Sequence, residues 1–229
     1  MSFRLSSVKY NGIKDMINKF KGDEKLELET RFMGKNFRGG KLDLKKYTET
    51  LNYFVASKEN GGLGLKNKVK SELQVFDDYD TNKRLVIEGQ PNIKKYWLGE
   101  DLENIDHIFM GKSRKAVVDV NEYSVRFSLA EEKDLDKGNE AIEYIKNTNS
   151  SSMKMYRLKN RYEVFSENGL ARIDFTSVKQ SSKTAGSFKN SDTLKSNVKY
   201  EIEVELLHSD KINKMSVEDI FKEYFTVIP

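Results

Sequence analysis

Apolar and polar residues alternate along most of this chain, which is the pattern of strands with one apolar and one polar face. Turn residues such as Ser166, Asn168 and Gly169 separate the alternating stretches. We predict eight strands, which run from Leu26 to Phe32, Lys66 to Phe76, Lys83 to Glu88, Lys115 to Asp119, Tyr123 to Leu129, Met155 to Phe165, Leu170 to Val178 and Lys199 to Leu207. Few helices accompany them, and this balance indicates a closed barrel or a sandwich.

Four stretches have the apolar spacing or the capping residues of helices. The first runs from Gly12 to Lys21, and Gly22 follows at the position of a C-cap. The other three begin at Asp43, at Pro91 and at Ser216, and the helix that Asp43 caps is expected to end near Ser57, before Asn60, Gly61 and Gly62. Two stretches rich in Ser, Lys and Asn are predicted as mobile loops, Asn147 to Ser152 and Ser181 to Asn197.

Composition narrows the class of protein and of site. The 229 residues suit a single domain over residues 1–229, and their 40 basic and 36 acidic side chains leave a net charge too mild to indicate a polyanionic partner by itself. No stretch suits a transmembrane span or the apolar core of a signal peptide, and cysteine is absent, so we expect an intracellular protein without disulfides. With only His107 and His208 available, a metal site would use carboxylate oxygens, which favour Mg²⁺ or Mn²⁺.

Two predicted strands near opposite ends of the chain carry acidic residues on one face. Glu27 and Glu29 precede Arg31 at two-residue spacing, and Glu201, Glu203 and Glu205 repeat that spacing. Side chains two apart in a strand share a face and lie roughly 6.5 to 7 Å apart, so these carboxylates repel one another unless a cation lies among them. The alternative is a pair of ordinary amphipathic strands whose glutamates face water.

Other strands carry the complementary charge on one face. The face shared by Arg157, Lys159 and Arg161 also includes Glu163, and the opposite face of that strand is apolar. The same contrast holds for Ser124, Arg126 and Ser128, and for Arg172, Asp174 and Thr176. If the apolar faces pack outward under helices and loops, the charged faces line a lumen that suits a metal-bound polyphosphate.

Four other motifs resemble functional sites, and three of them are interpreted as structural. Gly111-Lys112-Ser113 lacks the earlier glycine of a phosphate-binding loop, since Asp106 stands in its place. The glycines from Gly61 to Gly64 are read as a turn. Lys112, Arg114 and Lys115 are open to two readings, contact with an RNA backbone or a solvated charge run. Tyr96 and Trp97 are read as core residues rather than base-stacking platforms.

The strand motifs resemble the triphosphate tunnel metalloenzymes, in particular the RNA triphosphatases of fungal and large-DNA-virus mRNA-capping enzymes. The resemblance rests on four blocks that follow the family's order, Leu26 to Phe32 (LELETRF), Tyr156 to Tyr162 (YRLKNRY), Ala171 to Lys179 (ARIDFTSVK) and Tyr200 to Glu205 (YEIEVE). It implies a mainly β (α+β) fold, a closed antiparallel eight-stranded β-barrel that forms a tunnel with a polar lumen and has a few surface helices.

The resemblance also implies roles for the polar positions. Glu27, Glu29 and Glu205 match the direct metal ligands, and Glu203 matches the residue that holds the attacking water. Lys159 and Arg161 match basic positions that grip the phosphates during catalysis, with Arg126 as a further match from the central strands. Additional substrate-binding positions are Arg31, Arg157 and Arg172, and the residues that brace these groups are Asp174, Thr176 and Glu201.

The implied function is removal of the γ-phosphate from 5′-triphosphate RNA with Mg²⁺ or Mn²⁺, as the first step of mRNA cap formation, and nucleoside triphosphates are expected as further substrates. Arg31 favours this branch, because thiamine triphosphatases of the same family usually have lysine there. Two alternatives stay open. One is an inorganic or thiamine triphosphatase with the same tunnel, and the other is a non-catalytic barrel that binds polyphosphate or nucleic acid.

The capping resemblance also suggests partners. No Lys-x-Asp-Gly motif of a guanylyltransferase occurs in the chain, so we expect a triphosphatase domain alone, either excised or free-standing. A guanylyltransferase domain is the expected partner, linked or associated. No association with a membrane is expected. If the protein is viral, a cytoplasmic viral factory or the virion is its expected location.

Overall fold

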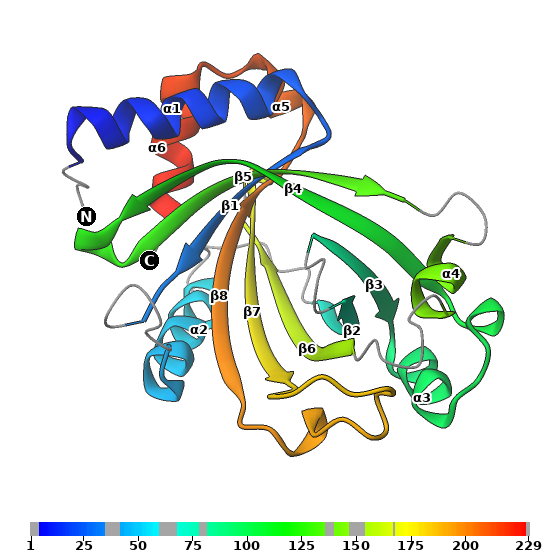
Figure 1. Cartoon of the computed structure of the whole chain (residues 1–229). Coiled ribbons are helices and arrows are strands. Elements are labelled where there is room, and N and C mark those ends of the chain that lie inside the picture. The colour runs from blue at the N-terminus through cyan, green and yellow to red at the C-terminus, as the bar shows by residue number, and fades with distance from the viewer. Residues whose placement is uncertain are drawn as a thin grey trace.

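Eight strands form the framework of the computed structural model, which describes residues 5–34, 42–59, 68–77, 82–135, 140–146, 154–166 and 168–227 (Figure 1). The strands are β1 (Leu26–Phe32), β2 (Lys68–Asp77), β3 (Lys83–Glu88), β4 (His107–Val120), β5 (Val125–Asp134), β6 (Lys154–Phe165), β7 (Ala171–Gln180) and β8 (Lys199–Leu206). Each overlaps one of the strands predicted from the alternating pattern. Lys66 and Asn67, at the start of the second predicted strand, lie outside the described residues.

The strands pair antiparallel and close into a barrel in the order β1-β5-β4-β3-β2-β6-β7-β8. The predicted closed eight-stranded antiparallel barrel is therefore confirmed. The seam between β1 and β8 brings the two acidic motifs together, since Glu29 lies opposite Glu205 and Arg31 lies opposite Glu203.

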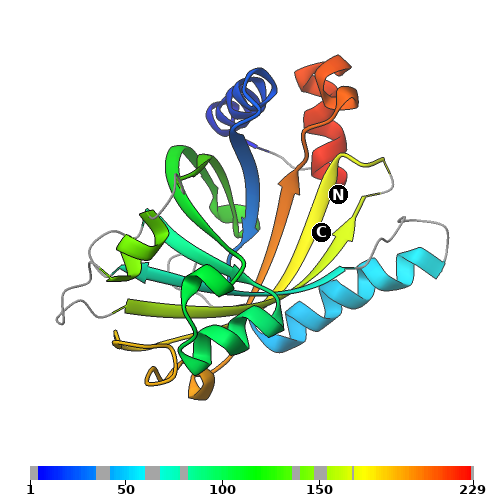
Figure 2. The ribbon, with the colours of Figure 1, turned by 90° about the vertical axis from the view of Figure 1, so that its right-hand side faces the viewer.

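Helices cover the outside of the barrel. They are α1 (Ser7–Gly22), α2 (Leu44–Glu59), α3 (Gln90–Leu98), α4 (Glu140–Lys146), α5 (Asp210–Lys214) and α6 (Val217–Val227), with short 3-10 helices η1 (Leu102–Asn104), η2 (Asn121–Tyr123) and η3 (Thr193–Lys195). Figure 2 shows α1 and α6 above the strands and α2 below them. No helix in the described ranges is long and apolar enough to span a membrane.

The predicted capping residues act as expected at two helices. Asp43 accepts a hydrogen bond from the Lys46 N–H at 2.7 Å, and Ser216 accepts one from the Asp219 N–H at 3.1 Å. Pro91 lies in the first turn of α3, where its missing N–H costs nothing. The first helix differs from the prediction. It begins at Ser7 rather than Gly12, and Gly22 is its last residue rather than its C-cap.

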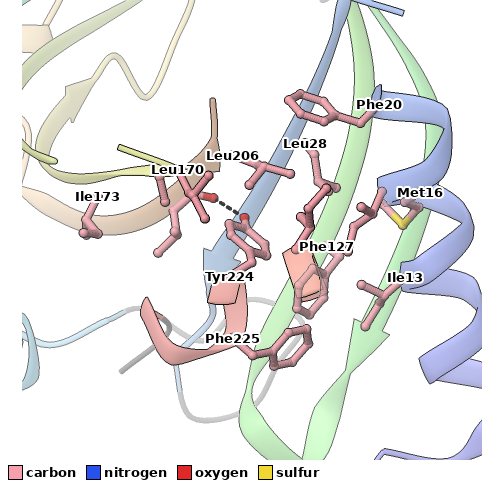
Figure 3. Close-up of a cluster of buried hydrophobic side chains, with 14 of the residues drawn as sticks. Ile13, Met16, Phe20, Leu28, Phe127, Leu170, Ile173, Leu206, Tyr224 and Phe225 are labelled. Carbon is pink, nitrogen blue, oxygen red and sulfur yellow. Dashed lines mark hydrogen bonds between the residues drawn. The ribbon is translucent and has the colours of Figure 1, made fainter. Parts of the chain in front are cut away.

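Buried apolar side chains lie between the barrel wall and these helices in two clusters. The larger one joins Met16 and Phe20 of α1 and Tyr224 of α6 to the apolar faces of the strands (Figure 3). The second joins Leu73, Ile87 and Tyr156 to Ile93 of α3 and to Phe188. The apolar strand faces therefore point outward, as the alternation predicted, and leave the polar faces to line the lumen.

The strand β4 is much longer than the predicted stretch from Lys115 to Asp119. Its pairing with β5 shifts register between Arg114 and Ala116, so Lys115 is an extra residue in a β-bulge. The bulge changes which residues face the lumen. Before it Lys112 and Arg114 line the cavity, and after it Asp119 lies opposite the lumen residue Arg126.

The segment from Ser181 to Asn197 has no strand, as predicted, but it is anchored to the barrel. Ala185 and Lys154 exchange two backbone hydrogen bonds of 2.9 Å, and Phe188 is only 3% exposed in the second apolar cluster. The expectation of a mobile loop is therefore wrong for this segment. The other predicted loop, from Asn147 to Ser152, lies outside the described residues.

Candidate functional site

The inward faces of all eight strands line a cavity of about 620 Å³ inside the barrel. Its acidic lining residues are Glu27, Glu29, Glu72, Glu88, Glu132, Asp174, Glu203 and Glu205. Its basic lining residues are Arg31, Arg84, Lys112, Arg114, Arg126, Arg157, Lys159, Arg161 and Arg172. The structure thus brings most of the sequence-predicted site residues into one chamber. Glu201 and Thr176 are not among the lining residues. Glu201 accepts a hydrogen bond from the lining residue Arg157. Thr176 is buried and is paired with Arg161 of β6 and Glu201 of β8 in the strand register.

Carboxylates gather where β1 meets β8. Burial raises the pKa of Glu29 to about 7, and the neighbouring Glu203 adds to this shift. Burial likewise raises the pKa of Glu205 to about 7, with a contribution from Glu27. Burial also raises the pKa of Glu27 itself. At this seam, burial together with repulsion among the carboxylates therefore outweighs the attraction of the nearby cations.

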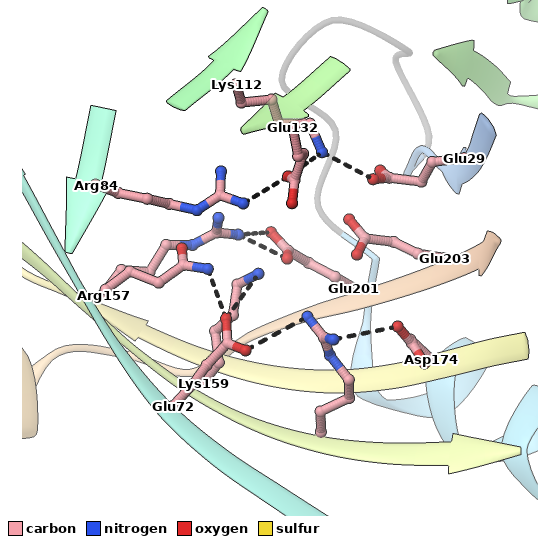
Figure 4. Close-up of polar contacts among 12 residues, drawn as sticks. Glu29, Glu72, Arg84, Lys112, Glu132, Arg157, Lys159, Asp174, Glu201 and Glu203 are labelled. Carbon is pink, nitrogen blue, oxygen red and sulfur yellow. Dashed lines mark hydrogen bonds and ion pairs between the residues drawn. The ribbon is translucent and has the colours of Figure 1, made fainter. Parts of the chain in front are cut away.

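Three basic side chains partly balance these carboxylates. Lys112 Nζ lies 3.0 Å from Glu27 Oε2 and 3.8 Å from Glu29 Oε2, and it also contacts Glu132 Oε1 at 2.9 Å (Figure 4). Arg172 Nη2 donates to Glu205 Oε2 at 2.5 Å. Arg31 Nη2 donates to Glu29 Oε1 at 3.3 Å, so Glu29 has two basic partners, whereas among the described residues Glu27 and Glu205 have one each.

The donor set of Glu27, Glu29 and Glu205 fits Mg²⁺ or Mn²⁺ in chemistry, because both metals prefer carboxylate oxygens. The raised pKa values of Glu29 and Glu205 indicate that a cation here would be stabilised. Within the ranges that the structure describes, no three acidic or histidine side chains are gathered closely enough to hold a metal ion. Binding would require these side chains to turn toward a common point.

Glu203 has a different environment from its neighbours on β8. Its residue surface is 6% exposed, and the Arg31 guanidinium forms a close ion pair with it. Burial alone would raise the pKa of Glu203, but Arg31 and Lys159 outweigh burial and lower it. Glu203 is therefore ionised at neutral pH, which makes it a strong hydrogen-bond acceptor and a weak base.

The basic face of β6 supplies two cations that make only long ion-pair contacts. Lys159 is 5% exposed, and its Nζ lies 3.5 Å from Glu72 Oε1. Burial and the nearby Arg157 lower the pKa of Lys159. Arg161 contacts Glu72 at 3.7 Å and Asp174 at 3.5 Å, which are ion-pair contacts too long for good hydrogen bonds. An added anion would therefore stabilise both side chains.

Buried guanidinium donors point to the same kind of ligand. Among the described residues, four arginine Nε atoms in this cavity are buried without a hydrogen-bond partner, those of Arg31, Arg84, Arg157 and Arg161. A buried donor without an acceptor costs free energy. The chamber therefore favours an anion that offers several acceptor oxygens, as a phosphate chain does.

The remaining predicted residues are tied into ion pairs. Arg157 donates to both carboxylate oxygens of Glu201, at 2.5 and 2.6 Å. Arg172 donates to Asp174 at 2.9 Å and 3.1 Å. Arg126 forms a two-pronged contact with Asp119, at 2.7 and 3.0 Å.

Sequence analysis missed several lining residues, namely Glu72, Gln74, Arg84, Lys112 and Glu132. For β2 and β3 the signal was present, because Glu72 and Gln74 alternate with buried Leu73 and Val75, and Arg84 alternates with Leu85. The reading of Lys112 as part of a solvated charge run is wrong. The bulge in β4 conceals the alternation that would have placed it in the lumen.

The fold has counterparts among solved structures. The RNA triphosphatase domain of a trifunctional mimivirus mRNA capping enzyme matches with a TM-score of 0.68 and 19% sequence identity, over 98% of this chain and 97% of that chain. Two further structures of the mimivirus capping enzyme triphosphatase match over the same shares of both chains, with TM-scores of 0.66 and 0.63 and identities of 19% and 18%. No protein-family model matches the chain, and no curated protein matches it in sequence. The expected resemblance is confirmed at the level of the fold: the chain is an eight-stranded tunnel barrel like the mimivirus capping-enzyme RNA triphosphatase domain.

Proposed function

We propose that this chain is a divalent-metal-dependent phosphohydrolase that removes the γ-phosphate from 5′-triphosphate RNA, as the first step of cap formation, and also hydrolyses nucleoside triphosphates. One observation carries the proposal. A single chamber holds carboxylates with raised pKa values, Glu29 and Glu205, and cations with only long ion-pair contacts, Lys159 and Arg161. A metal-bound triphosphate supplies both missing charges at once.

The proposed roles follow from the charges of each group. Glu27, Glu29 and Glu205 would hold Mg²⁺ or Mn²⁺, which polarises the terminal phosphate when bound. Lys159 and Arg161 would contact the phosphate oxygens, where positive charge stabilises the dispersed negative charge of the transition state. Ionised Glu203 would accept a hydrogen bond from the attacking water and orient it.

The other lumen residues have supporting roles in this proposal. Arg31 holds Glu203 by an ion pair, and Asp174 holds Arg172, which in turn contacts Glu205. Arg157 and Glu201 form a paired group next to Lys159 on the same side of the chamber (Figure 4). Arg126 binds substrate only if its contact with Asp119 opens.

The test is a phosphate-release assay with four substrates: RNA with a 5′-triphosphate, a nucleoside triphosphate, inorganic triphosphate and thiamine triphosphate. Each is measured with Mg²⁺, with Mn²⁺ and with a chelator. The proposal predicts metal-dependent release and the highest kcat/KM on RNA. Preference for inorganic or thiamine triphosphate would reassign the substrate, and absence of release from all four would leave a binding barrel instead of an enzyme.

A further inference from the structure

A second cavity lies on the outside of the barrel wall. Ser71 of β2 and Asn160 of β6 line it, whereas their strand neighbours Glu72 and Lys159 line the tunnel. Its volume is about 280 Å³, just below the range for small-molecule pockets, roughly 300 to 1,000 Å³. The helix α3 and the segment from Ser181 to Asn197 complete its walls. The wall of the barrel therefore separates this outer cavity from the tunnel.

Aromatic and aliphatic side chains form most of the surface of the outer cavity. Phe188 is held in place, because it is 3% exposed and its ring lies 5.6 Å from that of Tyr156, centroid to centroid. Trp97 also lines the cavity, so its reading as an ordinary core residue holds only in part. Two aromatic rings in one small cavity favour a flat, apolar ligand ring.

Carboxamide groups give the outer cavity its polar contacts. The Ser71 hydroxyl donates to Asn160 Oδ1 at 2.8 Å, which orients the amide and leaves its NH₂ group available. In the described part of the chain, neither that NH₂ group nor the Gln90 side chain has a hydrogen-bond partner. Amides offer the paired donor and acceptor pattern that matches the edge of a nucleobase.

The charge around the outer cavity is positive. Lys94 lines it, no acidic side chain does, and Lys189 Nζ lies 5.4 Å from the centre of the Trp97 ring. A flat apolar ring with hydrogen-bonding edges and an attached anion is the chemistry of a nucleotide. Going beyond the proposed hydrolysis in the tunnel, we propose that the outer cavity binds a nucleotide, its base beside Trp97 and Phe188 and its phosphate near Lys94.

Trp97 makes the test direct, because it is the single tryptophan of the chain. The full chain is titrated with AMP and with GMP, which lack the phosphates that the tunnel would hydrolyse, while tryptophan fluorescence is recorded. We expect a saturable change with at least one of them and none with inorganic phosphate alone. Lys94→Ala is expected to weaken binding about tenfold, the scale of one lost charged hydrogen bond. Lys45→Ala, at an exposed lysine of α2, is the matched control and is expected to leave binding unchanged.

Further arms identify the source of the nucleotide and separate this site from the tunnel. A short RNA with a 5′-hydroxyl is titrated in parallel. A fluorescence change with this RNA, but not with AMP or GMP, would show that the cavity binds a nucleotide that is part of an RNA chain. Lys159→Ala is expected to leave the fluorescence titration intact whether or not the tunnel hydrolyses triphosphates. The proposal is overturned if neither mononucleotides nor RNA produce a saturable change, or if Lys94→Ala and Asn160→Ala both bind like the unaltered chain.

Discussion

At the scale of single residues, Lys159 and Arg161 are the two cations proposed to contact the phosphates during turnover. Both lie inside the tunnel with ion-pair contacts of 3.5 Å or longer. Replacing either by alanine is expected to reduce turnover about 100-fold or more, the scale of losing one preorganised charge in a transition state. Mn²⁺ affinity, measured by calorimetry, is expected to change far less.

Controls distinguish loss of charge from loss of fold. Arg161→Lys keeps the charge but loses the planar geometry, so partial recovery of turnover is expected. Lys199→Ala, at an exposed position on β8, is expected to keep full activity. Wild-type rates in both lumen variants, or a loss of metal binding as large as that caused by replacing the proposed metal ligand Glu205 with alanine, would contradict the placement of β6 against the substrate.

The raised pKa of Glu205 gives a pH-dependent prediction for the metal-free protein. Its pKa rises from 4.5 to about 7 on folding, so the folded state retains the proton while the unfolded state releases it. Stability is therefore lost as pH rises from about 4.5 to about 7. Glu205→Gln removes the titrating group and therefore this loss. The Tm of the variant minus the Tm of the unaltered chain is expected to be at least about 2 °C larger at pH 7 than at pH 4.5. Melting curves in chelator buffer at several pH values check this, and a Tm difference that does not vary with pH would contradict it.

At the scale of elements, α6 holds the two acidic strands, β1 and β8, together from outside the barrel. The Tyr224 hydroxyl contacts Thr30 Oγ1 at 2.8 Å and donates to the Val204 carbonyl at 2.7 Å, so it joins β1 to β8 (Figure 3). Tyr224→Phe removes both contacts and is expected to reduce the free energy of unfolding by about 1 to 3 kcal/mol, since it leaves buried partners unpaired. Urea titration measures this loss. An unchanged midpoint would show that β1 and β8 hold their register without α6.

The segment from Ser181 to Asn197 also belongs to the core of the molecule. Phe188→Ala is expected to reduce the free energy of unfolding by about 3 kcal/mol or more, as expected for truncating a buried aromatic ring. Denaturant titration checks the value, with Lys183→Ala on the exposed surface of the same segment as the control. A loss below about 1 kcal/mol would show that this segment contributes little to the core.

The sequence predicts elements well where the alternation is unbroken. The bounds of β1 and β3 match the predicted stretches, and the four motif blocks lie on the expected strands. Prediction fails where one residue changes the period, as Lys115 does in the bulge of β4. It also fails where a few scattered apolar residues anchor a polar segment, because Ala185, Phe188 and Leu194 lie at irregular spacing in a Ser- and Lys-rich stretch and produce no periodic signal.

At the scale of the whole molecule, barrel closure creates the candidate site. Glu29 and Glu205 are distant in sequence and become neighbours only when β8 pairs with β1. The net charge of +4 does not reveal the tunnel, because acidic and basic residues are nearly balanced within it. The pairing of Lys112 with Glu27 and Glu132 could not be read from the sequence either, since it depends on the order of strands around the barrel.

Release of labelled γ-phosphate from 5′-triphosphate RNA, compared between the unaltered chain and Glu205→Ala, tests whether the seam of β1 and β8 holds a metal-dependent active site. We expect release with Mn²⁺ and no release with chelator. The variant is expected to lose release while its melting temperature is retained, because the change removes a proposed metal ligand and relieves repulsion with Glu27 and Glu29. Metal-independent release, or near-normal turnover by Glu205→Ala at saturating Mn²⁺, would contradict a metal-dependent reaction at the seam of β1 and β8.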